Sequence, residues 1–174
     1  MSEEEALKDS TVQAEVQKRV ATLTDACQKV LDAMLNTLQN LPYGLRLICK
    51  QIRNMTFERF PKTKPEEVFR TIGYFSFYRF VNTMIVQPDD YGVGDKNMSS
   101  VVVRKKLIAI SKVLQSLFLF GQFKPNNEFY PMNAWINKSK PTVLSYFQDL
   151  VDVSDPEEYL QVNRYIDLTI KSKP

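Results

Sequence analysis

Helical spacing near the N-terminus limits the folds that this chain can adopt. Apolar side chains recur there in steps of three and four, at Val12, Val16, Val20, Leu23, Cys27, Val30, Leu31, Met34 and Leu38. Steps of this size place side chains on one face of an α-helix. They predict one helix of roughly 30 residues and about 45 Å, with Ser2 and Glu5 as a capping box at its start. Such a long helix needs other helices packed against its apolar face.

Prolines and glycines divide the rest of the chain into further helices. The predicted helices span residues 43–57, 65–86, 101–120, 131–138 and 141–150, and a last one opens at 155–158. The helix over 65–86 is apolar nearly all round, which predicts a central position in a bundle. Only five glycines occur in 174 residues, which disfavours turn-rich β architecture. We therefore expect one all-α domain over 1–174, a helical bundle with one long N-terminal helix and a buried central helix.

The composition argues against several kinds of function. The chain has no histidine, which removes the commonest general base and metal ligand, so we expect neither a metal nor another cofactor. The net charge of +3 is spread among acidic residues and gives no nucleic-acid-binding stripe. Cys27 and Cys49 are predicted to be reduced core thiols of a cytosolic protein. No apolar run approaches the ~20 residues of a membrane span, so we expect a soluble, intracellular protein.

An arginine interrupts the most apolar part of the chain. The segment FYRFVNTMIVQP, residues 77–88, places Arg79 and Asn82 among aromatic and aliphatic residues. A buried guanidinium without partners costs several kcal/mol, so Arg79 is expected to be paired. From this pattern alone, the first interpretation is an ion pair with an acid at the edge of the core. Met84 and Trp135 are predicted to be core residues.

Three segments resemble the Ras GTPase-activating protein (RasGAP) domain, and more closely its IQGAP branch. LPYGLRLICKQIRN, residues 41–54, resembles the family's Pro-Tyr-Gly-Met-Arg segment. FYRFVNTMIVQPDDYGV, residues 77–93, resembles its signature Phe-Leu-Arg-x-x-Asn-Pro-Ala-Ile. RKKLIAISKVLQSL, residues 104–117, resembles the Lys-x-x-Gln helix that follows. The order and spacing also match, and with weaker similarity on either side the resemblance covers nearly all of the chain.

The resemblance implies a groove for a small GTPase between helices 69–86 and 104–119. In the family, the arginine that matches Arg79 donates to backbone carbonyls of the loop that presents a catalytic arginine finger. This implies that Arg79 is a buried brace, with Asn82 on the same helix face three residues on. The remaining candidates for the groove and brace are Tyr78, Lys112, Gln115 and Leu119.

The chain also departs from the family pattern. Thr83 and Met84 replace Pro-Ala, which predicts a straighter helix and a narrower groove. Leu119 stands where several active members have an asparagine facing the GTPase. Because the match begins in the middle of the family domain, we expect the domain to be partial and to lack the arginine-finger half. For Lys112 and Gln115 an ordinary exposed helix face is the alternative.

The resemblance implies a module that binds GTPases without being an enzyme. The IQGAP branch binds Rho-family GTPases and does not hasten hydrolysis. We therefore expect a GTP-bound Ras- or Rho-family GTPase as partner, with Rho types favoured. The resemblance also implies actin-associated and cytokinetic partners, which the chain would meet through a parent scaffold. This scaffold would lie in the cytoplasm, at the cell cortex, actin cytoskeleton or division site. Two alternatives stay open. In the first, the chain is part of a true Ras GTPase activator whose catalytic arginine lies outside it. In the second, the chain is a structural scaffold segment that binds no GTPase.

Overall fold

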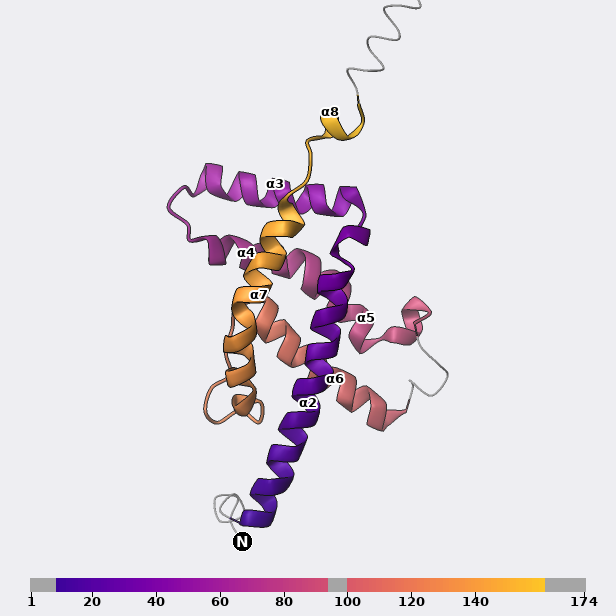
Figure 1. Ribbon diagram of the computed structural model, residues 1–174, viewed down its shortest axis with the longest axis vertical. Coiled ribbons are helices and arrows are strands. Elements are labelled where there is room, and N and C mark those ends of the chain that lie inside the picture. Colours follow the sequence, from indigo (N-terminus) through magenta and orange to yellow (C-terminus); the bar gives the residue numbers. More distant parts are fainter. Residues whose placement is uncertain (1–8, 94–99, 162–174) are drawn as a thin grey trace, which may run out of the picture.

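A computed structural model describes residues 9–93 and 100–161, and the secondary structure of these residues is helical throughout, with loops and turns between the helices and no strand (Figure 1). The α-helices are α2 (Ser10–Asn36), α3 (Tyr43–Arg59), α4 (Pro65–Gly73), α5 (Asn82–Val86), α6 (Val101–Phe118), α7 (Asn133–Val151) and α8 (Pro156–Tyr159). A π-helix (Tyr74–Val81) joins α4 to α5, and 3₁₀ turns occupy Leu38–Asn40, Pro88–Tyr91 and Tyr130–Met132. The all-α prediction is confirmed.

The long N-terminal helix is present as predicted. The Asp9 carboxylate caps α2 by accepting hydrogen bonds from two backbone N–H groups, at 2.7 and 3.4 Å. The predicted capping box of Ser2 and Glu5 lies outside the described residues. Cys27 and Leu31 are the fully buried residues of α2, and both belong to its C-terminal half. The N-terminal half therefore extends away from the core (Figure 1).

The core is rich in aromatic rings where α4, the π-helix, α6 and α7 meet. The rings of Phe77 and Phe118 stack with centroids 4.3 Å apart, and Phe147 meets Phe118 edge-on at 5.9 Å. Such pairs add about 0.5–1.5 kcal/mol beyond the burial of their area. Cys27 and Cys49 are buried free thiols, as predicted. The core prediction also holds for Trp135 but is wrong for Met84, which is 37% exposed.

The segment predicted as a central α-helix over 65–86 is helical throughout but is not buried all round. One side is buried through Val68, Ile72 and Phe77, while the other side is exposed at Tyr74, Tyr78, Phe80 and Met84. The prediction of a fully buried helix is wrong because α3, α6 and α7 cover only one face of this segment. The π-helix was not predicted either, because i→i+5 backbone hydrogen bonds leave no mark in the spacing of apolar residues.

The prediction of two helices around Pro141 is also wrong. A single helix, α7, runs through this proline. An internal proline costs about 3 kcal/mol or more in a helix. The helix continues because both of its halves bury side chains in one core, namely Trp135, Ile136 and Ser139 before the proline and Val143, Tyr146, Phe147, Leu150 and Val151 after it.

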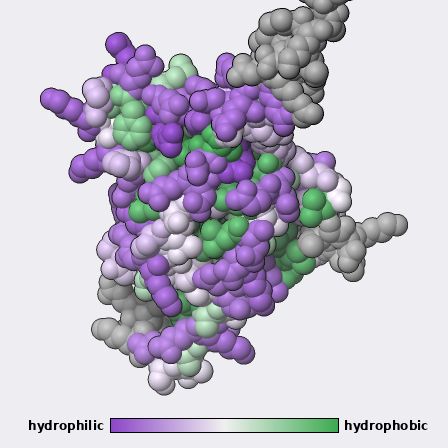
Figure 2. Space-filling model, turned by 45° about the horizontal axis from the view of Figure 1, so that its top comes forward, coloured by the Kyte–Doolittle hydropathy of each residue, from purple (hydrophilic) through white to green (hydrophobic). Residues whose placement is uncertain are grey.

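The surface carries both hydrophobic and hydrophilic side chains. Figure 2 shows hydrophobic residues in separate areas between hydrophilic ones on one face of the molecule. Among the described residues, no helix is long and apolar enough to cross a bilayer. The same part of the chain holds no group of three or more His, Cys, Asp or Glu side chains that is placed to bind a metal ion.

Candidate functional site

A surface hollow of about 520 Å³ lies where the sequence predicts the groove, and we call it the α4–α6 groove. Its lining residues come from α4, the π-helix, α6 and the loop that follows α6. They are Arg70, Tyr74, Lys112, Gln115, Ser116, Leu119, Gly121 and Phe123. The structure thus brings together three of the predicted site residues, Lys112, Gln115 and Leu119. The same list contains two that the sequence did not indicate, Arg70 and Tyr74.

The C-terminal end of α6 forms one wall of the groove. Phe120 has a left-handed backbone, with φ of 55°, and its N–H donates to the Leu117 carbonyl. The Gly121 N–H donates to the Ser116 carbonyl at 2.8 Å. These two bonds form a Schellman motif, which satisfies the last carbonyls of the helix. Phe120 takes the left-handed position that glycine usually occupies, and Gly121 follows it.

Arg70 holds that helix end from the other side of the groove. Its Nε donates to the Leu119 carbonyl at 3.0 Å, so a side chain of α4 caps α6. The helices approach very closely one turn later, where a Cβ added to Gly73 would lie 2.5 Å from the Phe118 carbonyl oxygen. The groove is therefore built on a rigid junction. No sequence pattern indicates Arg70, because its partner is a backbone atom 49 residues away.

Lys112 supplies a second positive charge to the groove. Its side chain is 54% exposed, and its Nζ lies 5.4 Å from the centroid of the Phe129 ring and 4.0 Å from Glu128. Exposed pairs of this kind are weak, so the ammonium group is available to a partner. The lining of the α4–α6 groove has two cations, Arg70 and Lys112, and no carboxylate. Its chemistry suits acidic side chains next to an apolar contact.

Asn82 lies beneath the surface instead of lining the groove. It is 9% exposed, and its Oδ1 accepts a hydrogen bond from the Ser111 hydroxyl at 2.6 Å. Ser111 is 4% exposed and belongs to α6. This bond therefore ties the start of α5 to the middle of α6, which makes Asn82 a positioning residue.

The predicted brace, Arg79, is exposed. Its guanidinium makes no hydrogen bond or ion pair with the part of the chain that the structure describes. The prediction that Arg79 is buried is wrong, and the alternative, an ion pair at the core edge, does not occur within the described residues. In an α-helix, residues three apart differ by about 60° around the axis. The π-helix widens the turn, so Arg79 faces outward while Asn82 faces inward.

Tyr78 is also exposed, at 41%, and does not line the groove itself. Its ring meets Tyr74 edge-on, with centroids 6.1 Å apart. Tyr74 does line the groove and is 50% exposed. Tyr78 and Arg79 thus lie on the outer face of the π-helix, beside the groove.

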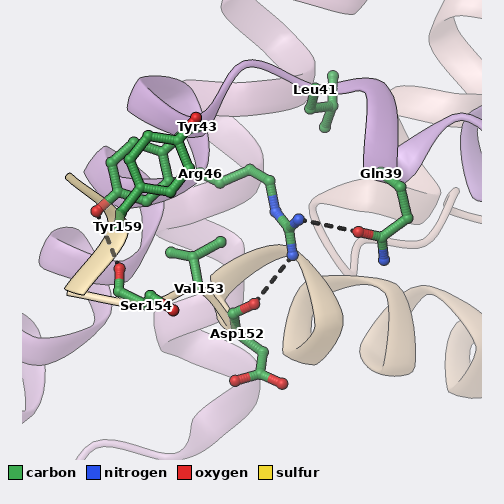
Figure 3. A pocket seen from close by; sticks show the side chains of 8 residues that line it. All are labelled: Gln39, Leu41, Tyr43, Arg46, Asp152, Val153, Ser154 and Tyr159. Carbon is green, nitrogen blue, oxygen red and sulfur yellow. Dashed lines mark hydrogen bonds between the residues drawn. The ribbon is translucent and has the colours of Figure 1, made fainter. Parts of the chain in front are cut away.

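A different arginine, Arg46, makes carbonyl hydrogen bonds of the kind expected of Arg79, but at the end of α7. Arg46, in α3, donates from Nη2 to the carbonyls of Asp149 and Asp152, at 2.7 and 3.0 Å, and from Nε to the Leu150 carbonyl at 3.2 Å. Its Nη1 donates to the Gln39 side chain at 3.2 Å (Figure 3). The last carbonyls of α7 have no partner within their own helix, and Arg46 satisfies them.

Two neighbours of Arg46 hold the segment that follows α7. Lys50 donates to the Val153 carbonyl at 2.6 Å, and the Tyr43 hydroxyl donates to the Ser154 carbonyl at 2.9 Å. The rings of Tyr43 and Tyr159 stack with centroids 3.6 Å apart (Figure 3). A hollow of about 300 Å³ lies among these groups. Because its strongest donors already bind carbonyls, we assign it a structural role.

These features define a helical domain with a positively charged groove. The sequence of the chain, compared with those of known proteins, shows its family. The chain belongs to the RasGAP family, since the family described as GTPase-activator protein for Ras-like GTPase matches residues 1–119. The resemblance to the IQGAP-like branch is confirmed by its relatives.

Three relatives illustrate the similarity. The chain is 39% identical to the Ras GTPase-activating-like protein rgaA of Dictyostelium discoideum, over 100% of the chain and 21% of that protein. It is 33% identical to the Ras GTPase-activating-like protein IQGAP2 of Mus musculus, over 98% of the chain and 11% of the relative. It is 30% identical to the Ras GTPase-activating-like protein rng2 of Schizosaccharomyces pombe, over 90% of the chain and 10% of that protein. The chain therefore spans about a fifth or less of these relatives.

Proposed function

We propose that this chain binds a GTP-bound small GTPase through the α4–α6 groove and does not accelerate GTP hydrolysis. The observation that carries the proposal is the convergence of Lys112, Gln115 and Leu119 with Arg70 in one groove. The cations offer partners to acidic side chains of a GTPase, while the Leu119 side chain offers an apolar contact. Electrostatic complementarity of this kind directs association and sets specificity.

The positions of the arginines support the non-catalytic part of the proposal. An arginine supplied in trans raises GTP hydrolysis by ~10³–10⁵, because its charge meets the charge that develops on the transferring phosphoryl group. Arg70 is tied to the Leu119 carbonyl, and Arg46 to three carbonyls at the end of α7. Anchored side chains of this kind are poorly suited to enter the active site of a partner.

A second candidate is a fragment of a true GTPase activator whose arginine finger lies outside these residues. One observation favours it, namely that Arg79 is exposed and uses none of its side-chain donors within the described residues. The resemblance assigns the carbonyl partners of this arginine to the finger loop. The third possibility, a scaffold segment without GTPase binding, predicts that the α4–α6 groove has no partner.

The wider setting follows from the same relatives and is part of the proposal. A RasGAP-family chain of the IQGAP-like branch fits a cytoplasmic scaffold with actin-associated and cytokinetic partners, located at the cell cortex or division site. Within that branch a Rho-type GTPase is our first choice of partner, and a Ras-type GTPase is the second.

The test compares binding with catalysis. Ras-type and Rho-type GTPases are loaded with GDP or with a non-hydrolysable GTP analogue and titrated with the purified chain by calorimetry. We expect binding of the GTP-analogue form, and little stimulation in single-turnover hydrolysis with GTP. Stimulation of about tenfold or more by the chain alone would overturn the non-catalytic part of the proposal. Absence of binding to either class would favour the scaffold segment.

A further inference from the structure

A second groove lies between α2 and α6, apart from the one already described. It has a volume of about 580 Å³, and its floor consists of the half-buried side chains of Leu23, Ala26, Ala109 and Ile110. It shares no lining residue with the α4–α6 groove, since it uses the first half of α6 and the other uses the second half. We call it the α2–α6 groove.

Lysines border this apolar floor on both sides. Lys18 comes from α2, and Lys105 and Lys106 come from α6. All three are exposed, and none makes an ion pair with the residues that the structure describes. The remaining charges at the rim are Arg19 and Glu15, which form a pair at 2.9 Å. The rim therefore carries a positive charge that nothing in the described chain neutralises.

The apolar surface continues from the groove along α2. Val16 is 38% exposed, and Val12 is half-buried. From Val12 to Ala26 the stripe rises about 21 Å, or roughly four helical turns. This length matches an amphipathic helix of about 14–18 residues.

We propose that the α2–α6 groove binds an amphipathic helix of a partner protein whose apolar stripe is flanked by aspartate or glutamate. A helix fits because its ridge of side chains packs into the furrow between two helices. Its acidic residues pair with Lys18, Lys105 and Lys106, which sets the orientation and the charge of the partner. This inference goes beyond the proposed function and does not depend on GTPase binding.

The probe is a designed helical peptide of about 18 residues. It is labelled with fluorescein and has leucines at i, i+4, i+7 and i+11 with glutamates beside them. One control peptide has lysines in place of the glutamates, and another has serines in place of the leucines. Fluorescence anisotropy with the full chain is expected to show binding of the first peptide only. Binding should weaken as salt rises, because the pairing charges are exposed.

Variants of the chain locate the binding surface. Lys105→Glu combined with Lys106→Glu is expected to weaken binding about tenfold or more. The matched control, Lys62→Glu with Lys138→Glu, makes the same change of charge at exposed positions outside the groove and should leave binding within about twofold. Ala109→Trp fills the floor without changing charge and should also weaken binding. Circular dichroism and thermal melts verify that each variant is folded.

Several outcomes would overturn the proposal. They are no binding of the glutamate peptide, equal binding of the lysine peptide, or equal loss in the control variant. Co-sedimentation with phosphatidylserine vesicles that depends on Lys105 and Lys106, without peptide binding, would assign the surface to an anionic membrane instead. Binding of the peptide that is unaffected by Ala109→Trp and by the lysine changes would place the site elsewhere.

Discussion

The Oδ1 atom of Asn82 accepts a hydrogen bond of 2.6 Å from the hydroxyl of Ser111, and both side chains are buried. The bond joins the end of the π-helix to the middle of α6, one turn before Gln115 in the groove. A hydrogen bond between uncharged groups contributes about 1 kcal/mol to the free energy of unfolding. Leaving one of the two groups unsatisfied in the interior costs about 1–3 kcal/mol.

We therefore expect Asn82→Ala to lower the free energy of unfolding by about 1–3 kcal/mol. Ser111→Ala should cost about as much. The double variant should lose less than the sum of the two, because removing both partners leaves no orphaned group. Urea unfolding of the three variants measures this coupling. Strictly additive losses would mean that the bond does not form in solution.

The contrast between Arg79 and Arg46 gives a second prediction. Arg79→Ala should change the free energy of unfolding by less than about 0.5 kcal/mol, because the side chain is exposed and unpaired within the described chain. Arg46→Ala should cost about 2–3 kcal/mol, since the carbonyls at the end of α7 lose their donors. Arg46→Lys should recover only part of this loss, because an ammonium cannot copy the guanidinium fork. Equal urea midpoints for Arg79→Ala and Arg46→Ala would contradict the assignment of the brace.

The close approach of α4 and α6 at Gly73 gives a third prediction. Gly73→Ala is expected to destabilise the protein by about 1–3 kcal/mol, since its Cβ would lie 2.5 Å from the Phe118 carbonyl oxygen. Gly44→Ala is the matched control, because nothing lies within 4 Å of a Cβ added there. Alanine favours helices, so this control should be neutral or stabilising by up to about 1 kcal/mol. Thermal melts of both variants test the difference.

The buried thiols make the free energy of unfolding depend on pH. Burial raises the pKa of the Cys27 and Cys49 thiols from 9.0 to about 12. Above pH 9 the unfolded chain loses these protons and the folded chain keeps them, so their contribution to stability is complete below pH 9 and falls between pH 9 and 12. Each thiol lowers the free energy of unfolding by up to ~1.4 kcal/mol per pH unit in that range.

Urea titrations at several pH values check this slope. Other groups, such as Tyr146, whose pKa burial raises from 10.0 to about 12, also contribute at high pH. The informative comparison is therefore with Cys27→Ala and Cys49→Ala together, which should have a shallower slope than the natural chain. Reaction of the natural chain with a thiol reagent should also be slow until urea unfolds it. An identical slope in the variant would show that the thiols ionise normally.

Docking of a GTPase gives the last prediction. Lys112→Glu should weaken binding of a GTP-analogue-loaded GTPase about tenfold or more, because it reverses a charge that faces the groove. The unfolding midpoint should stay unchanged, since Lys112 is largely exposed. Lys138→Glu makes the same change of charge on α7 and serves as the control. An equal effect of both variants would indicate long-range electrostatics instead of contact in the groove.

The fold was largely predictable because helix signals are local. The apolar stripe of α2, the Pro-Glu-Glu start of α4 and the Ser100 cap of α6, whose hydroxyl accepts from the Val103 N–H at 3.2 Å, all act within a few residues. The family resemblance then placed Lys112, Gln115 and Leu119 in one groove.

The errors share a different physical origin. The carbonyl partners of Arg46 lie more than 100 residues away and are backbone atoms, so no side-chain pattern records them. The exposure of Arg79 depends on a π-helix, and the continuity of α7 through Pro141 depends on tertiary packing that outweighs a local penalty. Each of these is a long-range or backbone effect.

The π-helix also has a consequence for comparing this chain with its relatives. If Tyr74–Val81 kept all its residues and closed as a regular α-helix, every side chain beyond it would be turned by about 100° around the axis. Asn82 would then no longer face Ser111, although its identity and its neighbours would be unchanged. A relative that aligns here without a gap but forms a regular α-helix would therefore differ by a rotation of the surface that percentage identity does not register.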